Sequence, residues 1–380
     1  MLRIAIDART VTAKKSGIGN YIEALIKHMV PMAEDVRFVL LRRRGDSEPI
    51  LRHPRVEEIA TFGETKSFHT HWIGRLHRFS GFDLFHGPAD LIPPGIKCPW
   101  VVTLHDLMWI ERPELASAFV PARVVLGAWY RAGFGHAIQG AERVIAISRS
   151  TASAIERVFP SEAQKVRVVH HGVDRGRYDL ALAGGRETIE RIVPAGVRYS
   201  LIVGQGSPYK NHVGMIRAFV EATREDPLHK LVLVRRFARV DRGMRELLER
   251  PDVKAKVIAV PFVTDAELLA LYRHAVALLF ASHYEGFGMP ALEAMAMDLP
   301  VLASTFPAVE EVTGGAALSA VSTDHADLTK KIRMMSSDAD LRTRLVEAGR
   351  ERVSAFSWEA CARSTLEVYR EAIEASKRRR

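Results

Sequence analysis

The sequence predicts an α/β protein made of two doubly wound domains, on the basis of three observations. Short β-branched runs alternate with stretches of helical spacing, which is typical of parallel strands joined by helices. This pattern restarts once, in the second half of the chain. The length of 380 residues also exceeds one ordinary domain. We therefore expect two Rossmann-like domains facing a cleft, at 1–180 and 181–357, and a helix over 358–380 that packs back towards the first domain.

The apolar runs locate the expected strands. In the first half they lie at 3–7, 36–41, 84–87, 100–106, 143–148 and 165–172. Helical spacing follows at 20–30 and 119–139, among others. A polar, glycine-containing stretch at 179–196 resembles a domain boundary, and the second set of strands is expected at 199–204, 230–235, 255–262, 277–282 and 300–304. The last helix is amphipathic, with apolar residues at Cys361, Leu366, Tyr369 and Ile373.

Composition and charge exclude several classes of protein. Hydrophobic residues make up 47% and charged residues 26%, which excludes a disordered or fibrous chain. Two cysteines are too few for a disulfide framework or a cysteine-based zinc site, and the polar N-terminus does not resemble a signal peptide. We therefore expect a cytosolic protein. The net charge is +9, and residues 1–180 hold 25 basic against 19 acidic residues, which favours an anionic partner near the first domain.

The most specific segment is 282–304, where Glu285 and Glu293 lie eight positions apart. The turn Gly286-Phe287-Gly288 separates them, and Pro290 suits the first turn of a helix. The N–H groups from Gly288 to Ala291, including that of Met289, can then hold an anion, while carboxylates accept hydrogen bonds from sugar hydroxyls. A nucleotide sugar fits both features. The simpler alternative is that Glu293 is a favourable acid on the first helical turn and that the glycines serve only the turn.

This segment resembles the Glu-x7-Glu motif of the retaining glycosyltransferases of family 4, which have the GT-B fold, and further segments follow in the order of that family over nearly the whole chain. The resemblance implies transfer of a sugar from a nucleoside diphosphate with retention of configuration. It also implies that Glu293 binds the ribose and Glu285 the sugar hydroxyls, while the backbone from Gly286 to Met289 faces the diphosphate.

A second segment, 199–219, reads as a strand, a Gly/Pro turn and a helix that begins near Asn211. Lys210 matches the family's lysine, and an ammonium at this position would stabilise the departing diphosphate without a metal. The family's usual arginine is absent, with Gln205 or Tyr209 in its place. Arg235 and Arg236, at a strand end, are candidates for the missing charge; an exposed lysine at a helix start is the alternative for Lys210.

The first domain carries weaker matches. His105 ends a strand, where side chains point into the ligand-binding crevice of such folds, and it resembles the family's histidine that contacts the donor or acceptor. Gly17 and Gly19 resemble the family's N-terminal glycine loop, although a simple tight turn explains them nearly as well. His171 replaces the usual asparagine in the segment 166–174.

The segment 260–275 resembles the part of the family that lies against the nucleotide base, so we expect the backbone around Phe262 and Val263 to contact the base. Thr264 to Glu267 is also a capping box, which explains the same residues without a ligand.

Rival functions have weaker support. Neither G-x-G completes the dinucleotide fingerprint, because Ile22 and Tyr209 occupy the third position. Asp338-Ala-Asp340 is better explained by a helix N-cap than by metal binding. His69 and His71 could share a metal only on a strand, whereas the spacing around them is helical, so we predict no metal site and no cofactor. The charge has no accompanying nucleic-acid-binding motif, so we predict no nucleic acid partner.

Residues 66–79 form a predicted basic amphipathic helix, with Phe68, Trp72, Leu76 and Phe79 on one face. It could lie on an anionic membrane or contact a lipid-linked acceptor, or simply pack on the sheet of the first domain.

The expected function is transfer of a hexose to a glycan or lipid-linked acceptor in cell-envelope polysaccharide or lipopolysaccharide synthesis. The leading donor is GDP-mannose, because the loop at 208–211 and the segment 286–296 resemble bacterial mannosyltransferases. UDP-glucose and UDP-N-acetylglucosamine are the alternative donors. A nucleotide-sugar-binding protein that does not transfer is the alternative from another class.

Overall fold

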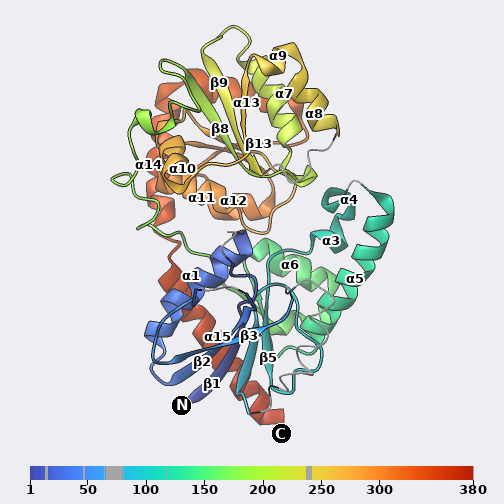
Figure 1. The fold of residues 1–380 in the computed structure, drawn as a ribbon. Helices are drawn as coiled ribbons and strands as arrows, with labels where there is room; N and C mark the ends of the chain where they lie inside the picture. The colour runs from blue at the N-terminus through green and yellow to red at the C-terminus, as the bar shows by residue number, and fades with distance from the viewer. Residues whose placement is uncertain are drawn as a thin grey trace. The chain divides into compact units, whose positions relative to one another are not determined.

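The computed structural model describes residues 1–12, 16–45, 48–63, 65, 79, 81–117, 119–236 and 242–379, and only the backbone of Ala122, Arg236 and Arg242. They form two compact units (Figure 1). The first comprises Met1–Pro113, Pro121–Gly172 and Phe356–Arg380, and the second comprises Glu114–Val120 and Val173–Ala355. The main segment of the second unit therefore begins at Val173, and the stretch 179–196 that resembled a boundary lies within it.

The first unit contains a parallel sheet in the order β3-β2-β1-β4-β5-β6-β7. Its strands are β1 (Leu2–Asp7), β2 (Val36–Arg43), β3 (Val56–Thr61), β4 (Leu84–Gly87), β5 (Trp100–Leu104), β6 (Arg143–Ala146) and β7 (Val166–Val168). β1 pairs in parallel with β2 on one side and with β4 on the other, so the chain reverses its direction of winding at β1. Ligands bind folds of this kind at the carboxyl ends of the strands beside such a switch point.

Helices cover both faces of this sheet (Figure 1). The helices of this unit are α1 (Gly17–Met32), α3 (Met108–Glu111), α5 (Val120–Gln139), α6 (Arg149–Val158) and α15 (Trp358–Arg379), with a short 3-10 turn η1 (Pro160–Lys165), while the short α4 (Pro113–Ala116) lies mostly in the second unit. Ile4 and Ile6 of β1 pack with α1 and α15, whereas Ala5 between them packs with the opposite cluster under α5 and α6. This alternation follows from the two-residue period of a strand. The predicted final helix is therefore confirmed as part of the first unit.

A buried chain of hydrogen bonds ties α15 to this sheet. The Tyr369 hydroxyl lies 2.6 Å from Nδ1 of His86, whose Nε2 lies 2.8 Å from the Thr103 hydroxyl. Thr103 in turn contacts the hydroxyl of Tyr21 on α1 at 3.2 Å. Burial, with a smaller contribution from His105, lowers the pKa of His86 to about 3, so its imidazole is neutral within this chain.

The second unit has a parallel sheet in the order β10-β9-β8-β11-β12-β13. Its strands are β8 (Arg198–Gln205), β9 (His229–Arg236), β10 (Val257–Val260), β11 (Leu278–Phe280), β12 (Val301–Ser304) and β13 (Leu318–Ala320). The switch point lies between β8 and β11. The loops that follow these two neighbouring strands therefore meet at one edge of the sheet.

The helices of the second unit surround that sheet (Figure 1). They are α7 (His212–Ala222), α8 (Arg242–Glu249), α9 (Pro251–Lys254), α10 (Asp265–His274), α11 (Met289–Ala296), α12 (Pro307–Thr313), α13 (His325–Ser337) and α14 (Ala339–Val353), with 3-10 turns η2 (Arg186–Ile189) and η3 (Pro208–Lys210). No helix within the described residues combines the length and apolarity that crossing a bilayer requires.

The sequence did not predict two strands. β3 is an edge strand with a central pair of glutamates, and β13 is only three residues long. The stretch 179–196, which resembles a boundary in the sequence, contains Ile189 and Val193, and both are fully buried in the second unit.

Candidate functional site

Lys210 and Glu285 meet at the edge where the loops after β8 and β11 come together. The Lys210 Nζ lies 2.7 Å from Oε1 of Glu285, and both side chains are largely buried, with 13% and 9% exposed. The ammonium also lies over the rings of Tyr209 and Phe280, 5.0 Å and 5.6 Å from their centroids. The two residues that the sequence assigned to the diphosphate and the sugar are therefore neighbours.

The loop after β8 positions Lys210. β8 ends at Gln205, whose side chain is exposed, and the short turn η3 carries Lys210. Asn211 then adopts a left-handed conformation with φ 53° and precedes α7, which begins where we expected. Its amide nitrogen donates to the carbonyl oxygens of Ala281 and Ser322 at 3.1 Å and 2.8 Å. These bonds attach the Lys210 loop to the end of β11.

Arg235 lies against the same loop from the end of β9. Its Nη2 donates to the carbonyl oxygen of Gly206 at 2.8 Å, and only 2% of the residue is exposed. A Cβ atom at position 206 would collide with the guanidinium, which would then have to move away from the loop. Burial and the neighbouring charges of Arg235 and Lys210 lower the pKa of His212 to about 3. Both cations therefore act on one small region of the loop. The side chain of Arg236, the other candidate, lies outside the described residues.

The glycine turn before α11 is a tight, buried bend. Phe287 is buried, and Gly288 has φ 117°, a conformation that favours glycine. Fewer backbone N–H groups are free to bind an anion than the four positions from Gly288 to Ala291 predicted. The Ala291 N–H donates to the Gly288 carbonyl at 3.0 Å, and Pro290 has no N–H. Within the described part of the chain, the N–H groups of Gly288 and Met289 have no protein acceptor, so these two remain for an anion. Gly286 lies directly before them.

Glu293 occupies a different position from the one predicted. α11 begins at Met289, so Glu293 is the fifth residue of the helix and its first turn carries no acid. The Tyr272 hydroxyl donates to its Oε2 at 3.1 Å, and the Tyr178 side chain also hydrogen-bonds to the carboxyl group. Burial raises the pKa of Glu293, while the two tyrosine hydrogen bonds and nearby Arg177 act in the opposite direction. The carboxylate is thus oriented by two hydroxyls.

The expected base-contacting segment is open. Phe262 is 66% exposed and Val263 is partly exposed, directly after β10. The capping box that we considered as the alternative is present. The Thr264 hydroxyl accepts from the Glu267 N–H, and the Glu267 carboxylate accepts from the Thr264 N–H at 2.8 Å.

His105 follows β5 in the first unit, as the sequence predicted, and is mostly buried. Its backbone N–H donates to Oδ1 of Asp90 at 2.7 Å, and its Nε2 lies 2.9 Å from the Pro88 carbonyl oxygen. A carbonyl can only accept, so Nε2 carries the proton and Nδ1 is the basic nitrogen.

Tyr21 and His171 lie beside His105. The Tyr21 ring meets the His105 ring edge-on at 5.1 Å and stacks on His171 at 4.5 Å. Burial, followed by the nearby His105, holds the pKa of His171 well below its usual value. His171, which stands where the family shows asparagine, is therefore an uncharged aromatic partner.

Gly17 and Gly19 lie in the first turn of α1 rather than in a loop, which corrects the prediction. The Ser16 hydroxyl caps this helix by accepting from the Gly19 N–H at 3.0 Å. A Cβ at Gly19 would lie 2.8 Å from the Thr10 carbonyl oxygen, whereas Gly17 has open space. Packing thus explains Gly19, and Gly17 has no such explanation.

Sequence reasoning missed Tyr178, Tyr272 and Asp90 as site residues. No local pattern marks the two tyrosines, because their contact with Glu293 joins segments 115 and 21 residues apart in the chain. Asp90 has φ 71°, which is uncommon for a residue other than glycine. No motif in the sequence predicts this conformation.

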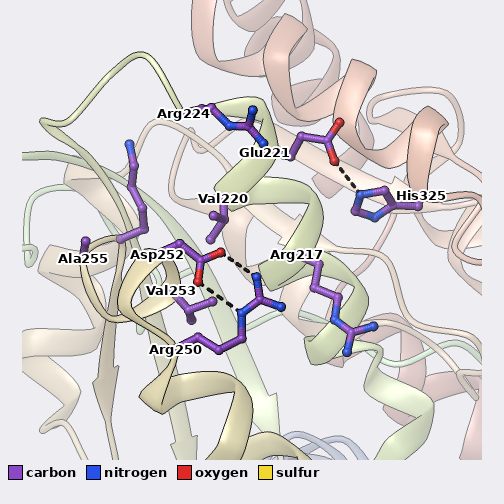
Figure 2. A pocket seen from close by; sticks show the side chains of 10 residues that line it. Arg217, Val220, Glu221, Arg224, Arg250, Asp252, Val253, Ala255 and His325 are labelled. Atoms are coloured by element: carbon purple, nitrogen blue, oxygen red, sulfur yellow. Dashed lines mark hydrogen bonds and ion pairs between the residues drawn. The ribbon is translucent and has the colours of Figure 1, made fainter.

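A separate hollow on the second unit lies between the end of α7, α9 and the start of α13 (Figure 2). Four of its ionic groups form two pairs: Arg250 contacts Asp252 at 3.1 Å and 2.7 Å, and His325 contacts Glu221 at 2.8 Å. None of the predicted donor-binding residues lines it, so we do not assign the nucleotide sugar to it.

Two other predictions concern the Asp338-Ala-Asp340 pattern and the basic helix over 66–79. Asp338 caps α14 by accepting from the Leu341 N–H at 2.8 Å, as predicted. The predicted helix over 66–79, including His69 and His71, lies outside the described residues, apart from the buried Phe79.

Comparison with known proteins gives consistent matches. Residues 187–352 match the family described as glycosyl transferases group 1, and residues 15–177 match Glycosyltransferase Family 4. The chain is 26% identical to O-antigen chain mannosyltransferase B of Escherichia coli over 76% of this chain and 74% of that protein. It is 24% identical to D-inositol 3-phosphate glycosyltransferase of Streptomyces scabiei over 98% of this chain and 86% of that protein.

Solved structures share the fold. Sucrose-phosphate synthase from Thermosynechococcus elongatus aligns with a TM-score of 0.73 and 22% identity over 99% of this chain and all of that one. WaaG, a glycosyltransferase involved in lipopolysaccharide biosynthesis, aligns with a TM-score of 0.73 and 15% identity over 97% of this chain and 99% of that one. Anabaena HepE in complex with UDP and glucose aligns with a TM-score of 0.71 and 17% identity over 97% of this chain and 99% of that one.

Proposed function

This chain belongs to the family 4 glycosyltransferases of the GT-B fold, and we propose that it moves a hexose from a nucleoside diphosphate sugar to a glycan or lipid-linked acceptor with retention of configuration. In this reaction the bond between the anomeric carbon and the diphosphate oxygen breaks, and its electron pair stays on the diphosphate. The acceptor hydroxyl loses its proton and forms the new bond on the same face of the sugar.

The observation that carries this proposal is the contact between Lys210 and Glu285 at 2.7 Å beside the start of α11. The lysine ammonium and the N–H groups of Gly288 and Met289 offer positive charge where the leaving diphosphate gains negative charge. The carboxylate of Glu285 offers acceptors for the hydroxyls of the departing sugar. Each group thus has a separate task, and their contact holds both side chains in place before the donor arrives.

We propose that Arg235 replaces the arginine that this loop lacks. Its guanidinium is held at Gly206 by a hydrogen bond of 2.8 Å, so it adds a fixed positive charge next to the Lys210 loop. With two cations at the loop, leaving-group stabilisation needs no metal ion, and we expect EDTA to leave turnover unchanged.

Glu293 is assigned to the ribose. Tyr178 and Tyr272 occupy part of its hydrogen-bonding capacity and fix its orientation, and the remaining acceptor positions suit a pair of ribose hydroxyls. The exposed backbone around Phe262 and Val263 remains our assignment for the base. On the first unit, we assign His105 to positioning the donor or acceptor, with Gly17 allowing close backbone approach.

GDP-mannose is the leading donor, supported by the similarity to an O-antigen mannosyltransferase. UDP-glucose is the alternative favoured by HepE, which shares the fold and has been solved with UDP-glucose, and UDP-N-acetylglucosamine is a third. An acceptor in envelope polysaccharide synthesis is consistent with the similarity to the O-antigen mannosyltransferase.

A thermal-shift series with GDP-mannose, UDP-glucose and UDP-N-acetylglucosamine tests the donor, because a ligand that binds only the folded state raises the melting temperature. Release of nucleoside diphosphate from the stabilising donor then tests for transfer. Stabilisation without any release, in the presence of glycan acceptors, would favour a binding protein that does not catalyse transfer. The absence of stabilisation by all three donors would contradict the donor assignment.

A further inference from the structure

The hollow between the end of α7, α9 and the start of α13 carries more positive than negative charge (Figure 2). Its volume of about 480 Å³ lies within the range of sites that bind small molecules. Its lining contains three arginines and one lysine against two carboxylates: Arg217, Arg224, Arg250, Lys256, Glu221 and Asp252. Residues 181–376, which include most of the second unit, hold 25 basic and 26 acidic residues. The positive charge of the hollow is therefore a local feature.

Two of the arginines have no acidic partner. Within the described residues, the side chains of Arg217 and Arg224 take part in no ion pair and no hydrogen bond, whereas Arg250 contacts Asp252 through two nitrogens. A guanidinium carries five N–H donors in a planar arrangement that matches the oxygens of a phosphate. A single exposed arginine is normally just hydrated, but two that line one hollow offer a ligand two separate anion contacts.

The spacing of these arginines indicates how an anionic ligand would be arranged. Arg217, Glu221 and Arg224 follow one another at intervals of four and three residues along α7 and the turn after it, so they share one side and Glu221 lies between the arginines. Seven residues of helix advance by roughly 10 Å. Glu221 contacts His325 at 2.8 Å and neither arginine. A single phosphate on both arginines would lie against this carboxylate and be repelled, whereas two anionic groups, one on each arginine, avoid it.

The middle of the hollow suits an uncharged, hydroxylated group. The carboxylates of Glu221 and Asp252 keep acceptor positions beyond their ion pairs, and these positions suit hydroxyl groups. Val220 and Val253 add apolar contacts, and Val253 is only 1% exposed. A compact polyol between two anionic groups therefore matches the order of charges along the hollow.

The wall beside Arg224 is fixed by Lys256. This lysine is only 8% exposed, and its ammonium donates to the carbonyl oxygens of Thr223 and Asp226 at 2.5 Å and 2.6 Å. These two residues flank Arg224 in the chain, so its backbone is held before a ligand arrives. Binding then has a smaller ordering cost to overcome.

We propose that this hollow binds a small hydroxylated molecule with two phosphate groups, one on Arg217 and one on Arg224, and with its hydroxyls on Glu221 and Asp252. The proposal is independent of the donor assignment, because none of the predicted donor-binding residues lines the hollow. A nucleic acid fits less well, since two carboxylates lie within the hollow and the stretch 181–376 has no positive surplus to attract an extended polyanion.

The test is calorimetric titration of the full chain at low ionic strength with fructose 1,6-bisphosphate, and with fructose 1-phosphate as the matched ligand that has one phosphate. The variants are Arg217→Gln and Arg224→Gln. The control variants are Arg333→Gln and Arg344→Gln, which remove exposed arginines of the second unit that do not line the hollow. All four side chains are exposed, so unchanged melting temperatures are expected. Stabilisation by the sugar donor, measured on the same variants, reports the proposed enzymatic function separately and should equal that of the wild-type protein.

The wild-type protein and both controls should bind the bisphosphate at least about tenfold more tightly than the monophosphate, the value of one additional charge-assisted contact. Arg217→Gln and Arg224→Gln should each lower the affinity for the bisphosphate to that of the monophosphate. Equal affinities in these variants and the controls, no preference for the bisphosphate, or no saturable binding by the wild-type protein would overturn the proposal. So would tighter binding of a single-stranded oligodeoxynucleotide that Arg217→Gln abolishes, since the hollow would then be part of a nucleic-acid surface.

Discussion

Removing one member of the Lys210–Glu285 pair should destabilise the second unit and also separate the two ligand-binding roles. At 2.7 Å, with an effective dielectric constant of about 20, the attraction between the charges is about 6 kcal/mol before desolvation. Most of this is offset by the cost of burying both groups, but a partner left alone keeps that cost. Lys210→Met or Glu285→Gln should therefore lower the free energy of unfolding by about 3 kcal/mol.

The double variant should lose less stability than the two single variants together, because it leaves no unpaired charge. Denaturant titrations of the four proteins give the coupling energy directly. Lys256→Met is a suitable control, since the ammonium of Lys256 is also buried in the second unit but donates to the carbonyl oxygens of Thr223 and Asp226. It should destabilise the fold without affecting nucleotide binding.

Ligand binding then distinguishes the roles. Lys210→Met should weaken binding of the bare nucleoside diphosphate by about tenfold or more, the value of a charge-assisted hydrogen bond. Glu285→Gln removes a negative charge next to the diphosphate, so it should leave that affinity unchanged or improve it, and weaken only the complete sugar donor. Calorimetric titration of each protein with both ligands measures this difference. Equal losses for both ligands in both variants would refute the division of roles.

Three further predictions follow from the same geometry. Gly206→Ala should displace the guanidinium of Arg235, and so lower both the free energy of unfolding and the affinity for the donor. Adding Arg235→Ala removes the collision, so the double variant should recover the stability but not the donor affinity. Denaturant titration measures the first quantity and calorimetric titration the second. Tyr272→Phe removes a hydrogen bond to ionised Glu293 and so raises its pKa further, and the loss of donor binding on acidification should begin at higher pH. His86 has a pKa of about 3 in the folded protein and an ordinary pKa near 6.5 when unfolded, so its contribution to stability is present above about pH 6.5 and is lost as pH falls towards 3. His86→Asn should reduce the dependence of the unfolding free energy on pH between about 7 and 5.

The sequence predicted most of the fold because buried parallel strands are continuous apolar runs that the helical stretches separate. It failed where this signal is weak. β3 has Glu57 and Glu58 at its centre, as an edge strand can, and β13 has three residues. The stretch 179–196 is mostly polar, and its apolar residues Ile189 and Val193 form no periodic pattern. Their burial in the second unit depends on contacts with residues distant in the sequence, which a local pattern does not predict.

One part of the candidate site was predictable from the sequence and another part was not. The meeting of Lys210 and Glu285 was predictable, because their loops follow strands whose carboxyl ends share one edge of a parallel sheet. The hydrogen bonds of Tyr178 and Tyr272 to Glu293 were not, since they join distant segments through side-chain packing. The helix α11 begins at Met289, directly after the left-handed Gly288, so Glu293 is its fifth residue and lies outside the first helical turn.

The most direct test of the account is the rate at which nucleoside diphosphate is released from the stabilising sugar donor by the wild-type protein and by Lys210→Ala, with saturating donor and a glycan acceptor. The wild-type protein should turn over, and the variant should be slower by about a hundredfold or more, as when one electrostatic stabiliser of a transition state is removed. Lys256→Met should keep the wild-type rate. A near-normal rate in Lys210→Ala would contradict the claim that this lysine stabilises the leaving diphosphate.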